Sequence, residues 1–309
     1  MKLQSRVKLA YFFKYSCLLY LPPQFQTDTH SVGHTHPPPP KMSRPWIFIC
    51  PSSRGIGHHL TRHLLRTTRV PILATARSPD PTLVRERLLS GLITPADDPS
   101  GRLEVVPCDV TIESTICSAA RRAASLFPPD RHHLHLAFAI PGILHPEKSA
   151  AQVDYADALE TFKVNVLGPL MLMKYFSGFL PRKMTELDLS EMDLPGHAVW
   201  VDMGARVGSI GDNKLGGWFS YRSSKAAVHS LTKCLDNQLY TKGGDKSMAM
   251  SYHPGTVKTD LSKEFWGSVA NDTLLDPEVA VEKMAAVVMG IKLEQRGKCW
   301  DYKGKEVPP

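Results

Sequence analysis

The sequence predicts an α/β fold, a single doubly wound parallel sheet with helices on both faces. Short apolar runs that suit buried strands recur along the chain. Stretches with helical spacing separate these runs, and strands that alternate with helices are typical of parallel sheets. The first strand also leads through a glycine-bearing turn into a helix, an arrangement that suits dinucleotide binding.

Each element follows from its local pattern. Six apolar runs are expected to be strands, at residues 46–50, 70–76, 103–108, 135–140, 198–202 and 248–252. Helices are expected at residues 58–66, 112–127, 153–166 and 168–180, and in the segment that runs through Tyr221 to about Tyr240. A last helix is expected to begin at Asp276-Pro277, because Asp is a favoured N-cap and Pro is favoured in the first turn.

Composition limits the class of protein. The 309 residues are 42% hydrophobic and 22% charged, which is typical of a soluble globular protein. Residues 1–44 hold six basic residues and one acidic residue, a net charge of +5, which leaves +2 of the total +7 for the rest. We therefore expect no nucleic-acid partner, since no basic stripe remains in the body of the chain.

Residues 1–44 differ from the rest and are expected to be a disordered or targeting-like extension, with residues 45–309 as the folded domain. The natural start could also be Met42, just before the first strand. We expect a cytoplasmic protein, or a mitochondrial one if residues 1–41 are a genuine presequence. The extension has too few unbroken apolar residues to span a membrane, and no membrane association is expected.

The segment after the first strand is a candidate phosphate site. It comprises Ser52, Ser53, Arg54, Gly55, Ile56 and Gly57. Glycines let the backbone approach a pyrophosphate, and a helix N-terminus offers free N–H groups and positive potential. Arg77 follows the second strand, where an arginine accommodates a 2′-phosphate, so NADP(H) is favoured over NAD(H). His59 and His63 are four residues apart but form no H-E-x-x-H motif, so no metal is expected.

Tyr221 and Lys225 are four residues apart, so on a helix they lie on one face. A fixed ammonium beside a phenol favours the phenolate, and we therefore expect the pKa of Tyr221 to fall. Tyr221 could then act as a general acid or base near neutral pH. The alternative is an ordinary surface pair, which is common for this spacing alone.

Together, these motifs resemble the short-chain dehydrogenase/reductases over about residues 45–305. The resemblance rests on the turn at 52–57, on Asp109 and Val110 after the third strand, on Asn165 in a helix, on the Tyr221/Lys225 motif, and on Pro254, Gly255, Val257 and Thr259 after the sixth strand. Residues 205–218 look like the C-factor/sniffer-type carbonyl reductase branch. The resemblance implies a Rossmann-type fold. It also implies that the dinucleotide is bound by the 52–57 turn, Arg77, Asp109, Val110, Tyr221, Lys225 and the 254–259 segment.

The resemblance also implies the reaction, the reduction of a small-molecule aldehyde or ketone by NADPH. Tyr221 would protonate the carbonyl oxygen, Lys225 would lower the pKa of Tyr221 and bind the ribose, and Asn165 would order a water. Residues 261–275, with Phe265 and Trp266, are expected to cover the substrate, although these aromatics could equally belong to the core or to an interface. Members of the family are commonly homodimers or homotetramers.

Three departures from the family pattern leave a second hypothesis open. Pro51 replaces the first glycine of the turn, residues 139–142 replace the usual N-N-A-G, and Ala205 replaces the catalytic serine. Ser209, twelve residues before Tyr221, could take over as the donor to the carbonyl. The alternative is a relative without turnover that serves as a dinucleotide-binding or partner-binding scaffold.

Overall fold

The computed structural model describes residues 42–309 except 93–97, 190–193 and 269–272. The N-terminal extension expected at residues 1–44 therefore lies outside the described residues, apart from its last three positions. Its division from the folded domain and the alternative start at Met42 stay predictions.

One mixed sheet of eight strands organises the described residues, in the order β10-β9-β6-β5-β4-β1-β2-β3. The six strands that the sequence predicts are all present: β1 Arg44–Cys50, β2 Ile72–Ala76, β3 Leu103–Pro107, β4 His132–Ala139, β5 Ala198–Met203 and β6 Ser247–His253. Two short strands, β9 Cys299–Asp301 and β10 Glu306–Val307, extend the sheet beyond β6. Among the described strands, only the β9–β10 pair is antiparallel, and β7 Thr256–Val257 pairs with β8 Leu274–Leu275 separately.

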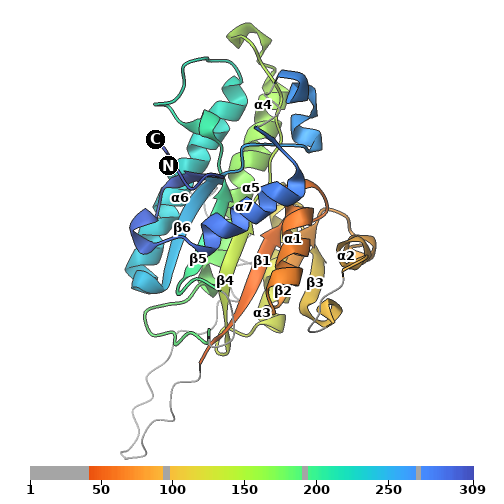
Figure 1. Ribbon diagram of the computed structural model, residues 1–309, viewed down its shortest axis with the longest axis vertical. Helices are drawn as coiled ribbons and strands as arrows, with labels where there is room; N and C mark the ends of the chain where they lie inside the picture. The colour runs from red at the N-terminus through yellow and green to blue at the C-terminus, as the bar shows by residue number, and fades with distance from the viewer. Residues whose placement is uncertain (1–41, 93–97, 190–193, 269–272) are drawn as a thin grey trace, which may run out of the picture. The chain divides into compact units, whose positions relative to one another are not determined.

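Helices cover both faces of the sheet (Figure 1). One face packs against α1 Gly55–Thr67, α2 Thr82–Leu89 and α7 Pro277–Met289, and the other against α3 Glu113–Leu126, α5 Gly168–Phe176 and α6 Phe219–Gly243. Successive side chains of β1 point to opposite faces of the sheet, and the residues on both faces are apolar. Ile47 and Ile49 belong to the first core, whereas Trp46, Phe48 and Cys50 belong to the second. The predicted doubly wound fold is confirmed.

The predicted break near residue 167 has a different form. Helix α4 Tyr155–Phe162 continues into a π-helical turn, Lys163–Leu167, which leads directly into α5. The helix thus continues through one wider, π-helical turn and does not end there. Such π-bulges are frequent at functional sites. Asn165 lies in this turn.

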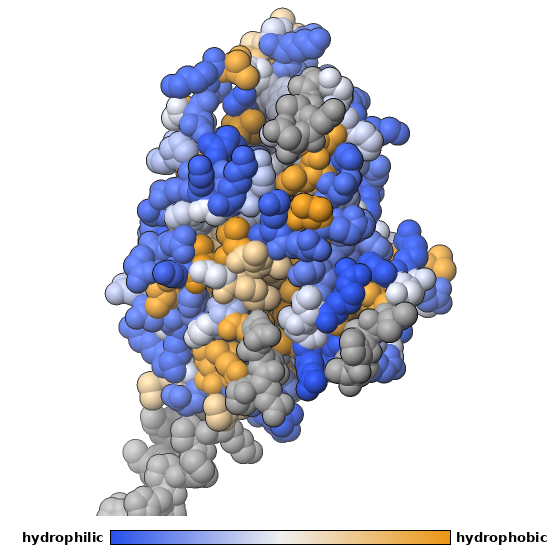
Figure 2. All heavy atoms as spheres, in the orientation of Figure 1, coloured by the Kyte–Doolittle hydropathy of each residue, from blue (hydrophilic) through white to orange (hydrophobic). Residues whose placement is uncertain are grey.

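The surface visible in the orientation of Figure 1 is mostly polar, with small apolar patches between the polar side chains (Figure 2). Within the described residues, none of the helices combines the length and the apolar character needed to cross a bilayer.

Candidate functional site

The predicted site residues follow the carboxyl ends of the parallel strands, which meet at one edge of the sheet. The 51–57 turn follows β1, residues 140–149 follow β4, residues 204–218 follow β5, and residues 254–268 follow β6. In a doubly wound sheet this edge is where ligands bind.

Helix α6 brings Tyr221 and Lys225 together as predicted. The Lys225 side chain is 1% exposed, and its Nζ donates a 2.7 Å hydrogen bond to the carbonyl of Met203 at the end of β5. Nζ lies 5.6 Å from the centroid of the Tyr221 ring. The loop after β5 lies directly on this part of the helix, because a Cβ built on Gly208 would lie only 2.7 Å from the carbonyl carbon of Lys225.

The predicted fall in the pKa of Tyr221 is wrong. Burial raises the pKa of Tyr221 to about 12 and lowers the pKa of Lys225 to about 8. Removing a charge from water disfavours the charged form of each group, so phenolate and ammonium both become costlier. The ammonium donates to a backbone carbonyl, and its attraction to a phenolate does not outweigh the burial of the phenol.

A buried carboxyl group lies behind this pair on β5. Asp202 is fully buried and accepts hydrogen bonds from Trp200 Nε1 at 3.0 Å and from Thr232 Oγ1 at 2.8 Å. Burial raises the pKa of Asp202 to about 7, against the opposing effect of its two hydrogen bonds and of Lys225. The sequence reasoning did not single out this residue, although an Asp inside an apolar strand is itself a signal.

Asn165 lies close to Lys225, but its side chain is already occupied. Its Oδ1 accepts from Ile143 N at 2.9 Å, and its Nδ2 donates to Ile143 O at 2.9 Å and to Ser224 Oγ at 3.1 Å. A Cβ built on Gly142 would lie 3.7 Å from Lys225 Nζ and 4.0 Å from Asn165 Oδ1. Asn165 thus fixes the loop after β4 beside the ammonium, and its role in holding a water stays a prediction.

Ser209 is engaged elsewhere. Its side chain is 1% exposed, and its Oγ donates to Pro309 O at 3.3 Å and accepts from Asp212 N at 3.0 Å. These contacts tie the loop to the end of the described chain and argue against the predicted role as carbonyl donor. Ala205, at the usual serine position, is 6% exposed and directly precedes the short 3-10 turn Arg206–Gly208.

The turn after β1 has the features predicted for a phosphate site. Helix α1 begins at Gly55, which has a φ of +55°, and no capping hydrogen bond from the side chain of its N-cap residue, Arg54, is present in the described part of the chain. A Cβ built on Gly57 would lie 1.9 Å from Pro51 O, so only glycine fits there. Ser52 is instead structural, because it is fully buried and its Oγ donates to Ile49 O. Ser53 and Ile56 are half-buried, and Arg54 is exposed.

The other predicted cofactor residues follow the next two strands of the sheet, β2 and β3. Arg77 is exposed directly after β2, and Asp109 Oδ1 accepts from Thr111 N at 2.8 Å and from Thr111 Oγ1 at 2.7 Å. Val110 packs against the start of α5, because a Cβ atom added to Gly168 would lie only 3.1 Å from the Cβ of Val110. β2 and β3 lie on the other side of β1 from β4, β5 and β6 in the sheet.

The segment after β6 meets the turn from the other side. The Thr259 methyl would lie 3.6 Å from a Cβ built on Gly55, so the two segments are neighbours. Pro254 is followed by Gly255, whose φ of +76° and close approach to the Tyr302 ring require glycine. Val257 is buried in β7.

Besides Asp202, two further groups at the site escaped the sequence reasoning. One is the backbone carbonyl of Met203, which holds Lys225 and leaves no mark in a side-chain pattern. The other is Glu147, a 4% exposed residue whose carboxylate accepts from Ser220 N and Ser220 Oγ at the start of α6. In the described part of the chain, no group of three or more His, Cys, Asp and Glu residues is placed to hold a metal ion.

Comparison with known proteins finds relatives across this region, although no family model matches the chain. The C-signal of Myxococcus xanthus is 33% identical over 156 residues, which cover 50% of this chain and 81% of that protein. The short-chain dehydrogenase srdF of Neurospora crassa is 27% identical over 273 residues, which cover 85% of this chain and 96% of that protein. The structure of an NADPH-bound carbonyl reductase from chicken fatty liver matches with a TM-score of 0.69 at 24% identity, over 87% of this chain and 99% of that one.

Proposed function

Because this chain belongs to the short-chain dehydrogenase/reductase family, we propose that it is an NADP(H)-dependent oxidoreductase of aldehydes or ketones. The reverse reaction, oxidation of the alcohol, uses the same groups. The observation that carries the proposal is the Tyr221/Lys225 pair at the carboxyl edge of the sheet, in which Lys225 is buried and Tyr221 is half-buried.

The residues present fit the dinucleotide. Within the described residues, the first turn of α1 has no side-chain cap and no acidic residue, so its N–H groups are left to bind a pyrophosphate. Arg77 supplies an exposed cation where a 2′-phosphate would lie, which favours NADP(H). Lys225 and the 254–259 segment would hold the ribose and the nicotinamide. The carbonyl reductase from chicken was crystallised with NADPH, which supports the same choice of cofactor.

The protein's own groups would perform the proton transfer. With its pKa raised to about 12, Tyr221 remains protonated at neutral pH and can donate to the oxygen of a bound carbonyl. Lys225, with a pKa of about 8, is mostly ammonium at pH 7 and provides positive charge near the developing alkoxide. The reduced dinucleotide, when bound, supplies the hydride.

The test is NADPH oxidation by the full chain with a panel of aldehydes and ketones. Tyr221→Phe removes the acidic proton and should lower kcat by about 10²- to 10⁴-fold, with NADPH affinity retained in a fluorescence titration. Tyr240→Phe is a matched control, because Tyr240 is an exposed tyrosine of the same helix whose ring under Arg296 is kept. Undiminished turnover in Tyr221→Phe would contradict the proposal.

A non-catalytic scaffold is the second candidate, and Ala205 favours it together with the engaged hydroxyl of Ser209. That hypothesis predicts NADPH binding without turnover for every carbonyl compound tested.

The homodimer or homotetramer and the cytoplasmic location stay predictions, to be tested by analytical ultracentrifugation and by imaging of the tagged chain.

A further inference from the structure

The backbone just before α6 is held in a costly conformation. Gly216, Gly217 and Trp218 all have positive φ values, of +64°, +67° and +49°. Among the described residues, Trp218 is the only one other than glycine with a positive φ. A bulky residue in this region is strained and persists only where its surroundings impose it, as they often do at functional sites.

Glu147 imposes the conformation from one side. Its backbone carbonyl accepts from Trp218 N at 2.6 Å, and its carboxylate accepts from Ser220 Oγ at 2.5 Å and from Ser220 N at 3.2 Å. Both Glu147 and Ser220 are buried, so these contacts are sheltered from water. One residue of the loop after β4 thus sets the position of Trp218 and caps the start of α6.

Arg222 fixes the same segment from the other side. Its Nε donates to Gly216 O at 3.1 Å and to Gly217 O at 3.0 Å, and its Nη1 donates to Val207 O at 3.2 Å. The segment is therefore held at both of its flanks, and the ring of Trp218 has a defined position before any ligand arrives.

That position is beside the proposed acid. The Trp218 ring lies edge-on to the Tyr221 ring, with centroids 6.1 Å apart, and 4.9 Å from the Phe265 ring. The segment that carries Phe265 also reaches the Lys225 side of the site. A Cβ atom added to Gly142 would lie 3.7 Å from Lys225 Nζ and 3.8 Å from Leu261 Cδ1. Trp218 and Phe265 are only half-buried, so the pair forms an aromatic wall with surface left for contact.

We propose that Trp218 is a specificity-determining residue that selects flat, ring-bearing carbonyl compounds over short aliphatic ones. This inference rests on the proposed function, since it concerns the same site. A rigid indole offers stacking beyond simple burial, and because the strain is held by Glu147 and Arg222, little ordering is required when a ring binds. We expect the wall to strengthen binding of a planar aryl ketone by about five- to tenfold.

The experiment compares two methyl ketones, 2-acetylnaphthalene and butan-2-one, with the full chain. Trp218→Gly removes the ring together with its contacts to Tyr221 and Phe265. Glycine adopts a positive φ without strain, which offsets that loss, so the variant should fold. Its kcat/KM for 2-acetylnaphthalene should fall at least fivefold, with butan-2-one changed less than twofold. Trp218→Phe should retain most of the discrimination. Phe219→Leu is the matched control, because Phe219 is the adjacent exposed aromatic residue, and it should change neither ketone.

A second readout needs no turnover. Calorimetric titration of 2-acetylnaphthalene into Tyr221→Phe protein, with and without Trp218→Gly, measures binding alone. A fivefold loss of affinity supports the aromatic wall even if no variant turns over, in which case only the proposed function fails. Unchanged affinity, or an equal fall in kcat/KM for both ketones, would overturn the inference and leave Trp218 a structural residue.

Discussion

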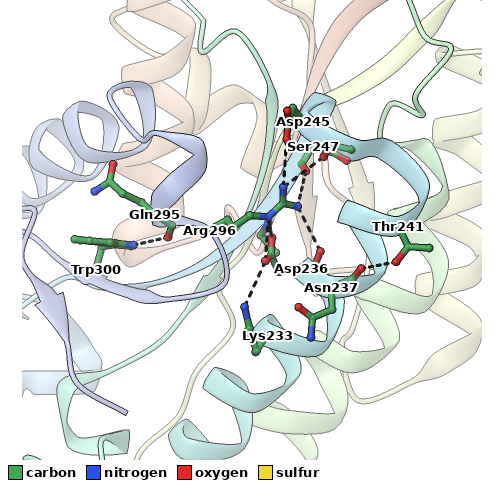
Figure 3. Close-up of polar contacts among 11 residues, drawn as sticks. Lys233, Asp236, Asn237, Thr241, Asp245, Ser247, Gln295, Arg296 and Trp300 are labelled. Carbon is green, nitrogen blue, oxygen red and sulfur yellow. Dashed lines mark hydrogen bonds and ion pairs between the residues drawn. The ribbon is translucent and has the colours of Figure 1, made fainter.

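The two ends of α6 treat a buried charge in opposite ways. At the carboxyl end, the Asp236 side chain is 2% exposed and fully partnered (Figure 3). Arg296 Nε donates to its two oxygens at 3.1 and 3.2 Å, and Ala249 N donates at 3.1 Å. The same guanidinium donates to Ser247 O at 3.1 Å, which joins the helix to β6.

At the amino end, the Lys225 ammonium is as deeply buried but donates to one backbone carbonyl, and burial lowers its pKa to about 8. One end of the helix is thus arranged for stability. The other keeps a poorly compensated charge beside Tyr221, as expected where activity is obtained at the expense of stability. Substitutions at the two ends should therefore have opposite effects.

The largest expected effect is at the carboxyl end. Asp236→Ala removes the buried carboxylate partner of the Arg296 guanidinium, whose side chain is 17% exposed, and leaves it, among the described residues, only the exposed Asp245 carboxylate at 3.9 Å. Breaking a buried pair in this way costs about 3–5 kcal/mol, which urea denaturation would measure. Activity per folded molecule should be unchanged, since Asp236 lies about three helical turns beyond Lys225.

Two controls sharpen this prediction. Replacing both partners, as Asp236→Leu with Arg296→Met, should restore much of the stability, because no buried charge remains. Glu306→Ala removes half of an exposed ion pair with Lys298 and should cost less than about 1 kcal/mol. A loss for Asp236→Ala no larger than that for Glu306→Ala would show that the carboxyl end is not a stabilising clamp.

At the amino end the expected sign reverses. Lys225→Met removes the buried ammonium and should raise the unfolding free energy at pH 7 by about 1–3 kcal/mol, while turnover is lost.

The stability difference should also depend on pH, because the pKa of Lys225 is about 8 in the folded chain against 10.5 for the free side chain. Between these values the unfolded chain binds more protons, so wild-type stability rises with pH there and the advantage of Lys225→Met shrinks. Paired urea titrations at pH 7 and 10 test this. A variant less stable than wild type at pH 7 would contradict it.

The fold was predictable from the sequence because its signals are local. The six predicted strands are mostly apolar and mostly buried runs, and all are present. The short strands β9 and β10 were not predicted, since they pair only two or three residues each with their neighbours. The π-helical turn at Asn165 was also missed, because it depends on hydrogen-bond spacing within a continuous helix and not on residue type.

The site was predictable where helical spacing or a motif decides it. The four-residue spacing placed Tyr221 and Lys225 together, and the family resemblance drawn from the motifs is confirmed. Burial decides a pKa, and no spacing reveals it, so the direction for Tyr221 was wrong. The partner of Ser209 is Pro309, a hundred residues away, and no local pattern connects the two.

The smallest expected effect concerns the missing carbonyl donor. Removing one such donor from comparable sites costs about 10²–10³ in rate. Since neighbouring groups are adapted to alanine, Ala205→Ser should recover only part of that, about tenfold in kcat/KM. Ser209→Ala is the matched variant. The Ser209 hydroxyl forms hydrogen bonds with Pro309 and Asp212. The Ser209→Ala substitution should therefore lower the melting temperature by a few degrees without changing kcat. A tenfold fall in kcat for Ser209→Ala, with no gain for Ala205→Ser, would instead identify Ser209 as the donor to the carbonyl. The Ser209 hydroxyl would then serve the reaction, as the Tyr221 phenol does, and would not be a purely structural group.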